Sequence, residues 1–370
     1  MKLSIERGAL LKSLAHVQSV VERRNTIPIL SNVLMDASKS ELRLTATDLD
    51  IEIVDTVPAK VTRAGAVTAP AHMLYEIVRK LPEGAQVTVE HNGDDPRVFI
   101  SAGRSEFKLA SLPREDFPAM PQADLPHKFV LSVDDLKRLI DRTRFAISTE
   151  ETRYYLMGIF LHALKKKKLL RAVATDGHRL ARAEVPLPKG AENLPGVIIP
   201  RKTVQEVRKL LDDAEGEITL AFSDNKVRFE IGGIVLTSKL IDGTFPDYER
   251  VIPATNGHVL SFEGSIFKSA VDRVSAVSTE RSRAVKLSLD GERLTLTVNN
   301  PDSGSATEEL VVSYDAEPLE IGFNAKYLLD IMDQLTGPEA RLHLTDAQSP
   351  TVVKDSEDEG VLYVLMPMRV

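Results

Sequence analysis

The chain contains three copies of one segment, and this internal repetition limits its fold more than any other feature. The copies recur at spacings of about 124 to 130 residues and together account for essentially all 370 positions. They open with strand patterns at residues 3–5, 129–131 and 259–262, each followed by apolar residues at helical spacing. Solenoid units repeat every 20 to 50 residues or so, and a period this long therefore indicates three duplicated domains.

A second helix is expected later in each copy. It starts after Pro70, after Pro200 and after Asn324, residue types that suit the first turn or the cap of a helix. Between the helices, apolar and polar residues alternate as they do in half-buried strands, for example around Leu42 and Leu44. Each copy therefore predicts an α+β design, with about two short helices on antiparallel sheet. The six expected helices span residues 9–24, 72–80, 134–144, 201–211, 266–283 and 325–335.

Proline-containing segments separate the copies. Phe-Pro pairs end the first two copies at residues 117–118 and 245–246, and linkers fall near 122–128 and 253–257. We therefore expect three domains, which would occupy residues 1–125, 126–256 and 257–370.

Composition excludes several classes of protein. At 43% hydrophobic and 27% charged residues the chain has the balance of an ordinary globular protein, long enough for three cores. No apolar run approaches the length of about 18 residues that a membrane helix needs, and no signal-peptide pattern precedes the first strand. The absence of Cys excludes disulfides, Cys-ligated zinc and thiol catalysis, and it fits a cytoplasmic protein.

The distribution of charge favours a polyanionic partner although the net charge is -7. The six expected helices hold 18 Lys and Arg against 10 Asp and Glu, which leaves the rest of the chain strongly acidic. If these helices share one side of the sheets, that side is basic, as in proteins that bind nucleic acid. The alternative is that Lys and Arg are common in helices because of their helix propensity.

Helix spacing indicates how such a face could surround a duplex. Helices packed about 8 to 10 Å apart would, if six closed a circle, leave a diameter of only roughly 15 to 19 Å through their axes. Twelve helices would give roughly 31 to 38 Å. Two chains are therefore the least that could enclose DNA.

Six short motifs follow one another along the chain, at residues 26–30, 153–156, 174–180, 245–248, 321–324 and 363–369. With these motifs the chain resembles the DNA polymerase III beta subunit family, the bacterial sliding clamps, over its full length. The resemblance implies three similar clamp domains per chain, in a head-to-tail dimer that forms a closed ring, with helices lining an inner face and antiparallel sheets outside. It also implies a replication processivity factor that tethers polymerases to DNA without catalysis, cofactor or metal.

The same resemblance implies a set of partners. They are double-stranded DNA bound without regard to sequence, a replicative DNA polymerase subunit, a clamp loader, and other polymerases and repair proteins that carry clamp-binding peptides. The alternative from another class is a DNA-binding regulator that uses the same basic helices without encircling DNA. Such a regulator should recognise a base sequence and bind linear DNA stably.

An apolar C-terminus points to a protein-binding surface. Chain ends are usually polar and frayed, whereas this one carries Met, which adapts to different partners, and Pro, which holds an apolar surface without an ordering cost. In the family this tail joins middle-domain motifs in one peptide groove. Carried over residue by residue, the groove comprises Arg153, Leu156, Thr175, Gly177, His178, Arg179, Leu180, Pro246, Arg250, Val251, Tyr327, Val364, Met366, Pro367, Met368 and Arg369.

Some positions near this groove have another reading. Strand alternation places Tyr363 and Leu365 on the face opposite to the groove, where they would be buried. Gln348 and Pro350 stand where the family often has smaller or apolar residues, and they form the expected far wall of the groove.

The family match also assigns contacts to DNA and between subunits. Arg24 is the strongest single DNA position; His72 and Glu150 depart from the basic or amide residues of some relatives. The expected DNA contacts are Arg24, Arg79, Tyr154, Tyr155, Arg201, Lys202, Arg281 and Arg283. The expected dimer contacts are Arg104, Phe107, Lys108, Leu109, Ala276, Val277, Glu308 and Glu309, where Phe107 could instead be core of its own domain.

Three further patterns have a functional and a plain structural interpretation. Asp176 and His178 could suggest acid-base chemistry, but no nucleophile or third ligand stands at a diagnostic spacing. Asp48, Asp50 and Glu52 could hold a cation on one strand face, although a solvated face is the better interpretation. The basic run at residues 165–168 could touch phosphate, and a solvated hairpin turn is again favoured.

Overall fold

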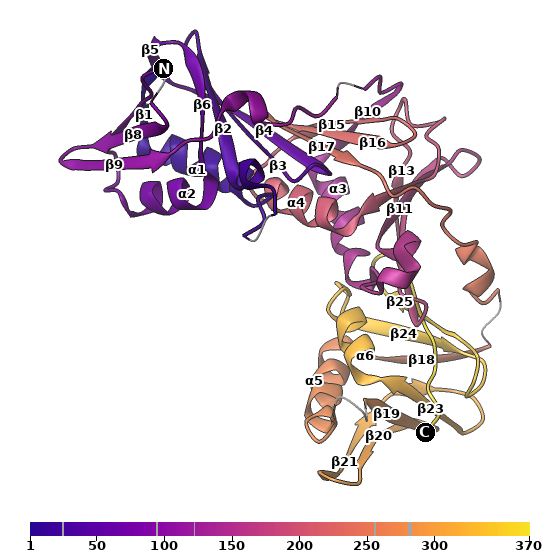
Figure 1. The fold of residues 1–370 in the computed structure, drawn as a ribbon. Coiled ribbons are helices and arrows are strands. Elements are labelled where there is room, and N and C mark those ends of the chain that lie inside the picture. Colours follow the sequence, from indigo (N-terminus) through magenta and orange to yellow (C-terminus); the bar gives the residue numbers. More distant parts are fainter. Residues whose placement is uncertain (24–25, 94, 122, 255–256, 280–282) are drawn as a thin grey trace. The chain divides into compact units, whose positions relative to one another are not determined.

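The computed structural model describes residues 1–23, 26–93, 95–121, 123–254, 257–279 and 283–370. The chain forms two compact units (Figure 1). The first contains Met1–Val133, Pro188–Ala191 and Lys202–Leu240, and the second contains Asp134–Leu187, Glu192–Arg201 and Ile241–Val370. The middle copy of the repeat contributes segments to both units, so the compact units do not coincide with the three repeats.

Two antiparallel sheets build the first unit. In the five-stranded sheet the order is β5-β1-β7-β8-β9, and in the eight-stranded sheet it is β10-β15-β16-β17-β4-β3-β2-β6. The larger sheet crosses from the middle copy to the first copy where β17 pairs with β4 and Leu236 lies opposite Ile53. The strands are β1 (Lys2–Glu6), β2 (Asn32–Ser38), β3 (Glu41–Thr47), β4 (Ile51–Pro58), β5 (Lys60–Arg63), β6 (Gly65–Pro70), β7 (Gln86–Glu90), β8 (Arg97–Ala102), β9 (Ser105–Ala110), β10 (His127–Ser132), β15 (Glu217–Phe222), β16 (Lys226–Ile231) and β17 (Ile234–Lys239).

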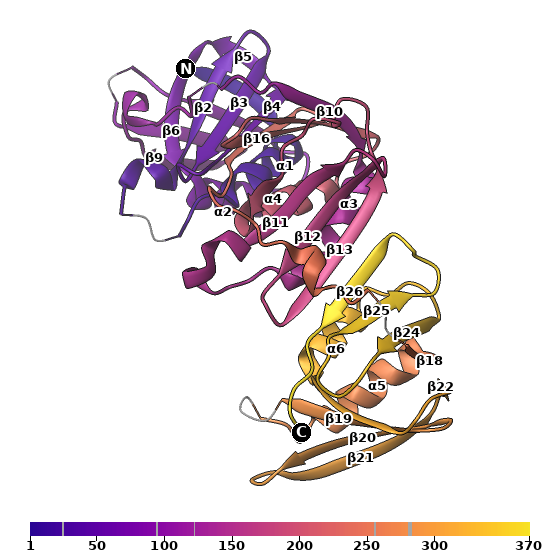
Figure 2. The ribbon, with the colours of Figure 1, turned by 90° about the vertical axis from the view of Figure 1, so that its right-hand side faces the viewer.

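The second unit also contains two antiparallel sheets. Their orders are β14-β11-β12-β13-β26-β25-β24-β18-β22 and β21-β20-β19-β23. The nine-stranded sheet joins the middle and third copies where β13 pairs with β26 and Leu180 lies opposite Val364 (Figure 2). The strands are β11 (Gly158–Leu164), β12 (Leu169–Thr175), β13 (Arg179–Pro186), β14 (Val197–Pro200), β18 (His258–Glu263), β19 (Ala284–Asp290), β20 (Arg293–Asn300), β21 (Gly304–Val311), β22 (Ser313–Tyr314), β23 (Leu319–Asn324), β24 (Glu339–Leu344), β25 (Thr351–Asp355) and β26 (Val361–Leu365).

The described residues form six α-helices at the six expected places, and their starts agree with the sequence better than their ends. Asn324 caps α6 by accepting N–H groups from Lys326 and Tyr327, as Asn does at helix N-termini. Four helices end earlier than expected, most of all α1, which stops at Gln18 and not at residue 24, and α5, which stops at Ser275 and not at residue 283. The other two are α3, which ends at Asp141, and α6, which ends at Met332. The helices are α1 (Arg7–Gln18), α2 (Ala71–Lys80), α3 (Val133–Asp141), α4 (Arg201–Asp212), α5 (Gly264–Ser275) and α6 (Ala325–Met332).

The apolar patterns of the sequence form the cores. Leu42 and Leu44 on β3 and Leu10, Leu14 and Val17 on α1 are all fully buried. With the observed helix bounds, the helices hold 13 Lys and Arg against 8 Asp and Glu. The basic excess of the helices is thus smaller than the sequence indicates, because the residues past the ends of α1 and α5 include several Arg.

Two hairpins have well-defined turns, and the first of them is the turn that the sequence predicts. Lys165 to Lys168 connect β11 to β12 and are exposed, which agrees with a solvated turn. Gly291 connects β19 to β20 with a φ of 58°, a conformation that glycine adopts without strain. In the described part of the chain, no helix is long and apolar enough to cross a membrane.

Candidate functional site

The loop between β12 and β13 is held by its own side chains. Asp176 Oδ1 accepts the N–H groups of His178 at 2.9 Å and of Arg179 at 3.0 Å, and its Oδ2 accepts from Arg179 Nε at 3.1 Å. Thr175 Oγ1 donates to the Arg179 carbonyl at 2.7 Å. These bonds occupy both carboxylate oxygens of Asp176 in holding the turn.

Arg179 links this loop to α6 and contributes a buried wall. Its side chain is only 8% exposed, and Nη1 donates to Asp330 Oδ2 at 2.5 Å while Nη2 donates to the Phe145 carbonyl at 2.8 Å. The guanidinium carbon lies 4.3 Å from the ring centre of Tyr327, a cation–π distance. Burial is the main cause that raises the pKa of Tyr327. Two expected groove residues, Arg179 and Tyr327, are thus in direct contact.

Arg153 packs over the same loop from the 3-10 helix Glu151–Leu156. Its Nε donates to Glu150 Oε2 at 2.8 Å, and this hydrogen bond is the main cause that lowers the pKa of the Glu150 carboxyl. A Cβ at Gly177 would lie 2.5 Å from Arg153 Nη1, so the arginine rests where only glycine leaves room. Gly177 also has a φ of 86°, which favours glycine on its own account.

Three expected groove residues form a buried floor. Leu156, Leu180 and Val364 belong to one hydrophobic cluster that also contains Phe245 and Tyr248. Val364 is 2% exposed, and the whole of β26 is buried, including Tyr363 and Leu365. The expected burial of those two residues is confirmed, whereas an open face for Val364 is not what the fold shows. Because β13 and β25 flank β26 and both faces are covered, alternation does not separate an inside from an outside here.

Two chain segments that continue from this floor carry exposed apolar side chains. Val251 is 47% exposed at the end of the 3-10 helix Tyr248–Val251, which Pro246 precedes. On the tail, Met366 and Met368 are 40% and 39% exposed. Contiguous exposed apolar side chains commonly mark a binding surface, and both segments follow directly on floor residues, Tyr248 and Val364. Pro246, Arg250 and Arg369 are exposed beside them, and Pro367 is half-buried.

Backbone hydrogen bonds hold the tail in place. The Met366 N–H donates to the His178 carbonyl at 2.9 Å, and the Met368 N–H donates to the Gly322 carbonyl at 2.8 Å. A Cβ at Gly322 would lie 2.2 Å from Val370 Cγ1 and 2.8 Å from the Met368 carbonyl oxygen. Glycine at this position therefore lets the tail approach β23, a feature that the groove assignment from sequence missed.

The expected far wall is a polar turn. Asp346 accepts the N–H groups of Gln348 at 2.8 Å and of Ser349 at 2.7 Å between β24 and β25. Gln348 is exposed and Pro350 is half-buried, and Val352, which follows on β25, reaches the buried floor.

The residues expected to contact DNA differ in their solvent exposure and in whether their charge is already paired within the chain. Arg24 and Arg281 lie outside the described residues. Arg79 is exposed on α2 and pairs with Glu76 at 2.7 Å, and Arg201 and Arg283 are exposed. Tyr154 is 52% exposed, whereas Tyr155 packs against the buried cluster.

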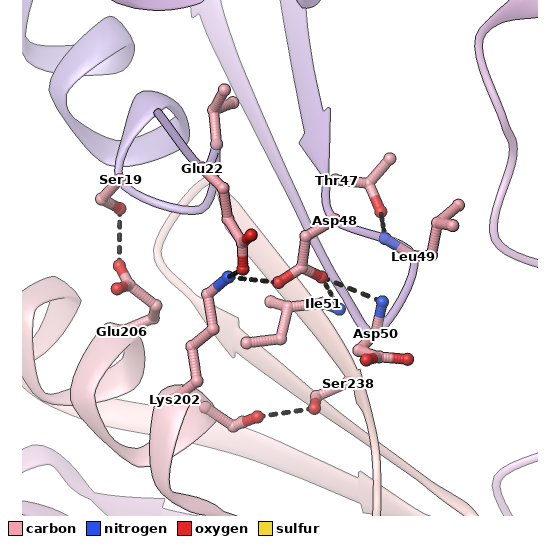
Figure 3. A network of polar contacts seen from close by, with 12 residues as sticks. Ser19, Glu22, Thr47, Asp48, Leu49, Asp50, Ile51, Lys202, Glu206 and Ser238 are labelled. Carbon is pink, nitrogen blue, oxygen red and sulfur yellow. Dashed lines mark hydrogen bonds and ion pairs between the residues drawn. The ribbon is translucent and has the colours of Figure 1, made fainter. Parts of the chain in front are cut away.

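Lys202 is already held by carboxylates of the first copy (Figure 3). Its Nζ donates to Glu22 Oε1 at 3.0 Å and also to Asp48. Burial lowers the pKa of Lys202, but the hydrogen bonds to Asp48 and Glu22 outweigh burial and the net effect raises it. The structure therefore gives the charge of Lys202 a partner within the chain, which DNA would have to displace.

The acidic run near residue 50 is a turn with separate partners. Asp48 Oδ1 accepts the N–H groups of Asp50 at 2.9 Å and Ile51 at 2.7 Å, which shapes the turn from β3 to β4 (Figure 3). Asp50 pairs with Lys239 at 2.9 Å, and Glu52 accepts the Met120 N–H at 3.2 Å. These carboxylates do not converge, and the described residues contain no cluster of acidic or histidine side chains suited to a metal ion.

Most of the residues expected at the dimer contact lie on two edge strands or next to them, whereas Ala276 and Val277 follow α5. In the first unit β9 is an edge strand, with Phe107 half-buried, Leu109 buried, and Arg104 and Lys108 exposed. In the second unit β21 is an edge strand, and its Val311 is 88% exposed. An edge strand presents unpaired backbone groups that another strand can satisfy.

Several of the expected third-copy contacts have partners within their own unit. Glu308 pairs with Arg273 at 2.5 Å, and Glu309 lies 3.9 Å from Arg293. Ala276 is exposed just after α5, and the carbonyl of Val277 accepts from Asn300 Nδ2 at 3.0 Å.

Comparison with known proteins agrees with this arrangement. Family models of the DNA polymerase III beta subunit match the chain in order, the N-terminal domain at residues 1–121, the central domain at 130–247 and the C-terminal domain at 249–369. The chain belongs to the DNA polymerase III beta subunit family. Like its relatives, this beta subunit therefore consists of three clamp domains of mixed helix and antiparallel sheet.

Relatives of this beta subunit match it from end to end. The beta sliding clamp of Caulobacter vibrioides is 57% identical over 372 residues, covering 100% of both chains, and that of Escherichia coli K12 is 38% identical with the same coverage. One similar crystal structure is that of the C. crescentus beta sliding clamp, which has polyethylene glycol bound in a proposed beta-motif tethering region. Its TM-score is 0.98 at 57% identity, and the match covers 100% of this chain and 99% of that one. A Bartonella birtlesii clamp bound to griselimycin has a TM-score of 0.98 at 50% identity, covering 100% of both chains.

Proposed function

We propose that this beta subunit acts as a sliding clamp, a ring-shaped homodimer that encircles duplex DNA and tethers polymerases during replication. The observation that carries the proposal is the match of all three clamp domains in order, combined with the apolar surface around the C-terminal tail. The ring itself rests on the family and on two of the edge strands, β9 in the first unit and β21 in the second. As a replication factor it would work in the cytoplasm, where bacterial DNA lies.

The proposed tethering site is the surface built on the Leu156, Leu180 and Val364 floor. A short peptide with apolar side chains would pack against Val251, Met366 and Met368, which are exposed in the free chain. Met adapts its shape to different side chains, and a surface that serves several partners needs that property. The partners proposed are a replicative polymerase subunit, the clamp loader, and other polymerases and repair proteins with clamp-binding peptides.

The griselimycin complex of the B. birtlesii relative supports a ligand-binding role for a clamp of this type. The polyethylene glycol in the C. crescentus relative lies in a region proposed to tether beta-binding motifs. We extend this role to the groove residues named above, of which Arg153, Gly177, His178, Arg179 and Tyr327 form one contiguous group through their mutual contacts.

The role that we propose for this chain is non-catalytic. Asp176 is occupied by backbone and Arg179 N–H groups, so it does not serve as a free general base. The protein would act by staying on DNA, and the chemistry would belong to the polymerase that it tethers.

Contacts with DNA would be made to phosphates. The proposed contributors are Arg24, Arg79, Arg201, Arg281 and Arg283, with Tyr154 beside the duplex. Phosphate contacts carry no sequence information, and a ring that slides needs contacts of this kind. We expect direct binding to be weak, independent of sequence and sensitive to salt.

Retention on circular DNA tests encirclement. The protein is loaded on a nicked circular plasmid by its clamp loader, washed at a salt concentration that eliminates direct binding, and measured before and after linearisation. A ring stays on the circle and leaves the linear DNA by sliding off its ends. Protein that remains on unblocked linear DNA as long as on circles would contradict encirclement and favour the regulator.

Arg24→Ala separates direct contact from encirclement. This variant should bind DNA less well and load more slowly, but rings that are already loaded should remain on the circle. Arg63→Ala is a matched loss of one exposed arginine outside the proposed contacts, and it should behave as the unmodified protein does.

A further inference from the structure

A cavity of about 400 Å³ lies in the first unit beside the helix pair α1 and α4, whereas the residues of the proposed groove belong to the second unit. Its volume falls within the range of roughly 300 to 1,000 Å³ that small-molecule sites occupy. The two helices are bridged by Ser19, which directly follows α1 and whose Oγ donates to Glu206 Oε2 on α4 at 2.5 Å. The cavity also borders β4 and the β16–β17 hairpin, and its apolar walls are Ala9, Val57, Leu210, Ile231 and Ile234.

A buried hydroxyl without a partner lines this cavity. Ser13 is 1% exposed, and its Oγ has no hydrogen-bond partner although it sits on α1 at the cavity wall. Buried polar groups are nearly always hydrogen-bonded, because an unpaired one loses its hydration without compensation. Ser13 is therefore an unpaired polar group beside the cavity whose oxygen is closed off from solvent.

A second unmet contact lies one helical turn further along α1. His16 Nδ1 lies 2.7 Å from Asp55 Oδ2, so the ring donates to this buried carboxylate. On its other side His16 Nε2 lies 3.8 Å from Asp213 Oδ2, which is too long for a hydrogen bond. In the neutral ring Nε2 is an acceptor, and it then faces a carboxylate that is also an acceptor. An N–H donor placed between the two would bond to both.

The charge of the lining favours a cation. Asp55, Asp213 and Glu215 contribute three carboxylates, while Lys12 is the one Lys or Arg among the lining residues. Lys12 Nζ already lies 3.4 Å from Asp213 Oδ2. A metal ion is disfavoured, since the described residues contain no group of His, Asp and Glu arranged to hold one. An organic cation with an apolar body fits both the acidic residues and the aliphatic walls.

We propose that this cavity binds a small organic cation, with an ammonium or amidinium head that donates to His16 and Asp213. The apolar part of the molecule would lie against Leu210, Ile231 and neighbouring aliphatic side chains. The site is separate from the DNA and peptide contacts proposed above, so its test does not depend on them.

Benzamidine is a suitable probe, because it joins a flat apolar ring to a planar cationic group with several N–H donors. Benzoate and benzyl alcohol have the same ring with an anionic or a neutral head. Each compound is titrated into the full-length protein and followed by NMR, and crystals are soaked with benzamidine. We expect benzamidine to bind in the cavity at low millimolar concentration and benzoate not to bind. The proposal would be overturned if benzoate bound equally well or if benzamidine bound elsewhere. It would also be overturned if benzamidine did not bind up to about 20 mM, on the order of the weakest affinities of interest for such small ligands.

Three variants test the contacts. Asp213→Asn removes one exposed carboxylate and should weaken benzamidine about 2- to 5-fold, the range expected for an exposed ion pair. Glu83→Gln makes the same change of charge at an exposed residue outside the cavity lining and should leave the affinity unchanged. Ala9→Leu fills the cavity without changing its charge and should abolish binding. Thermal unfolding verifies that each variant is folded. Equal effects of Asp213→Asn and Glu83→Gln, or normal binding to folded Ala9→Leu, would contradict the site.

Discussion

Lys202 Nζ donates to Glu22 Oε1 at 3.0 Å, which joins the start of α4 to a residue 180 positions earlier in the chain. Asp48 completes the contact from the turn between β3 and β4. From the sequence, Lys202 was expected to contact DNA. Its partners make it a structural link between the first and middle copies.

Lys202→Ala should therefore destabilise the protein and have little effect on direct DNA binding. The change leaves Asp48, whose side chain is 9% exposed, without its cation. Removing one partner of a fully buried pair costs about 3 to 5 kcal/mol, and because Lys202 is about one-third exposed we expect roughly 1 to 2 kcal/mol. Chemical denaturation measures the loss. Arg201→Ala is the matched control, for which we expect weaker DNA binding and little change in stability; the reverse pattern for the two variants would return Lys202 to the DNA surface.

Gly322→Ala should weaken the binding of clamp-binding peptides. The added methyl group would overlap Val370 and the Met368 carbonyl, which pushes the tail off β23. Overpacking of this kind costs about 1 to 3 kcal/mol, and a loss of about tenfold in affinity corresponds to 1.4 kcal/mol. Fluorescence anisotropy with a labelled polymerase peptide measures the change. Gly233→Ala is a control in a turn where a Cβ meets only one atom, at 3.6 Å, and it should bind normally.

Deleting residues 366–370 gives a stronger version of the same test. The truncated protein should lose peptide binding while it remains folded and dimeric, because the buried strand β26 ends at Leu365. Unchanged affinity would remove the tail from the groove. Loss of the folded state would show that the tail mainly closes the sheet.

The stability of the second unit should depend on His162. Burial, followed by the nearby Arg171 charge, lowers the pKa of His162 from 6.5 to about 4. Between pH 6.5 and pH 4 the unfolded chain therefore binds a proton that the folded chain does not, so stability is lost as the pH falls through this window. Glu184 and Glu249 oppose the shift but do not cancel it.

His162→Gln should remove this part of the pH dependence. A shift of this size corresponds to at most about 3 kcal/mol at pH 4. The measurement is the difference in unfolding free energy between the two proteins at pH 7 and at pH 4.5. The advantage of the unmodified protein should shrink at the lower pH; a constant difference would contradict the pKa assignment. His127→Gln, in a half-buried position of the first unit, serves as a control for the loss of one histidine.

The protein should be a stable homodimer of about 82 kDa, twice the chain mass of 40.8 kDa. Native mass spectrometry at micromolar concentration tests this, and a monomer there would count against the ring. Phe107→Ala should weaken the dimer by roughly 1 to 4 kcal/mol if the exposed part of Phe107 is an interface anchor. Phe99→Ala, on the neighbouring strand β8, removes the same type of side chain away from the sheet edge and should affect association less.

The sequence predicted the repeating elements well because each depends on local patterns. Helix starts follow from Pro200 and Asn324, and the strands follow from alternation. The end of α1 at Gln18 was missed because apolar residues continue at Val20 and Val21, which are buried after the helix has stopped. Periodicity does not distinguish a buried turn from another turn of helix.

Site residues were harder to predict wherever the deciding partner is distant in the chain. The burial of Val364 depends on pairing with Leu180 on β13, and the occupation of Lys202 depends on Glu22 and Asp48. Gly322 carried a clearer signal, since a glycine inside a strand often marks a close approach of backbone. The tail that approaches it could be identified only from the fold.

The pairing of β17 with β4 and of β13 with β26 has a consequence for the mechanical integrity of the chain. At both junctions successive copies share a hydrogen-bonded ladder, including Leu236 opposite Ile53 and Tyr363 opposite Ala181. The covalent linkers are thus not the main attachment between copies. After a protease cut near residues 253–257, the two fragments would stay associated through the hydrogen bonds between β13 and β26. A mechanical force applied to the ends of the chain would have to break many of these hydrogen bonds at once before the copies separate.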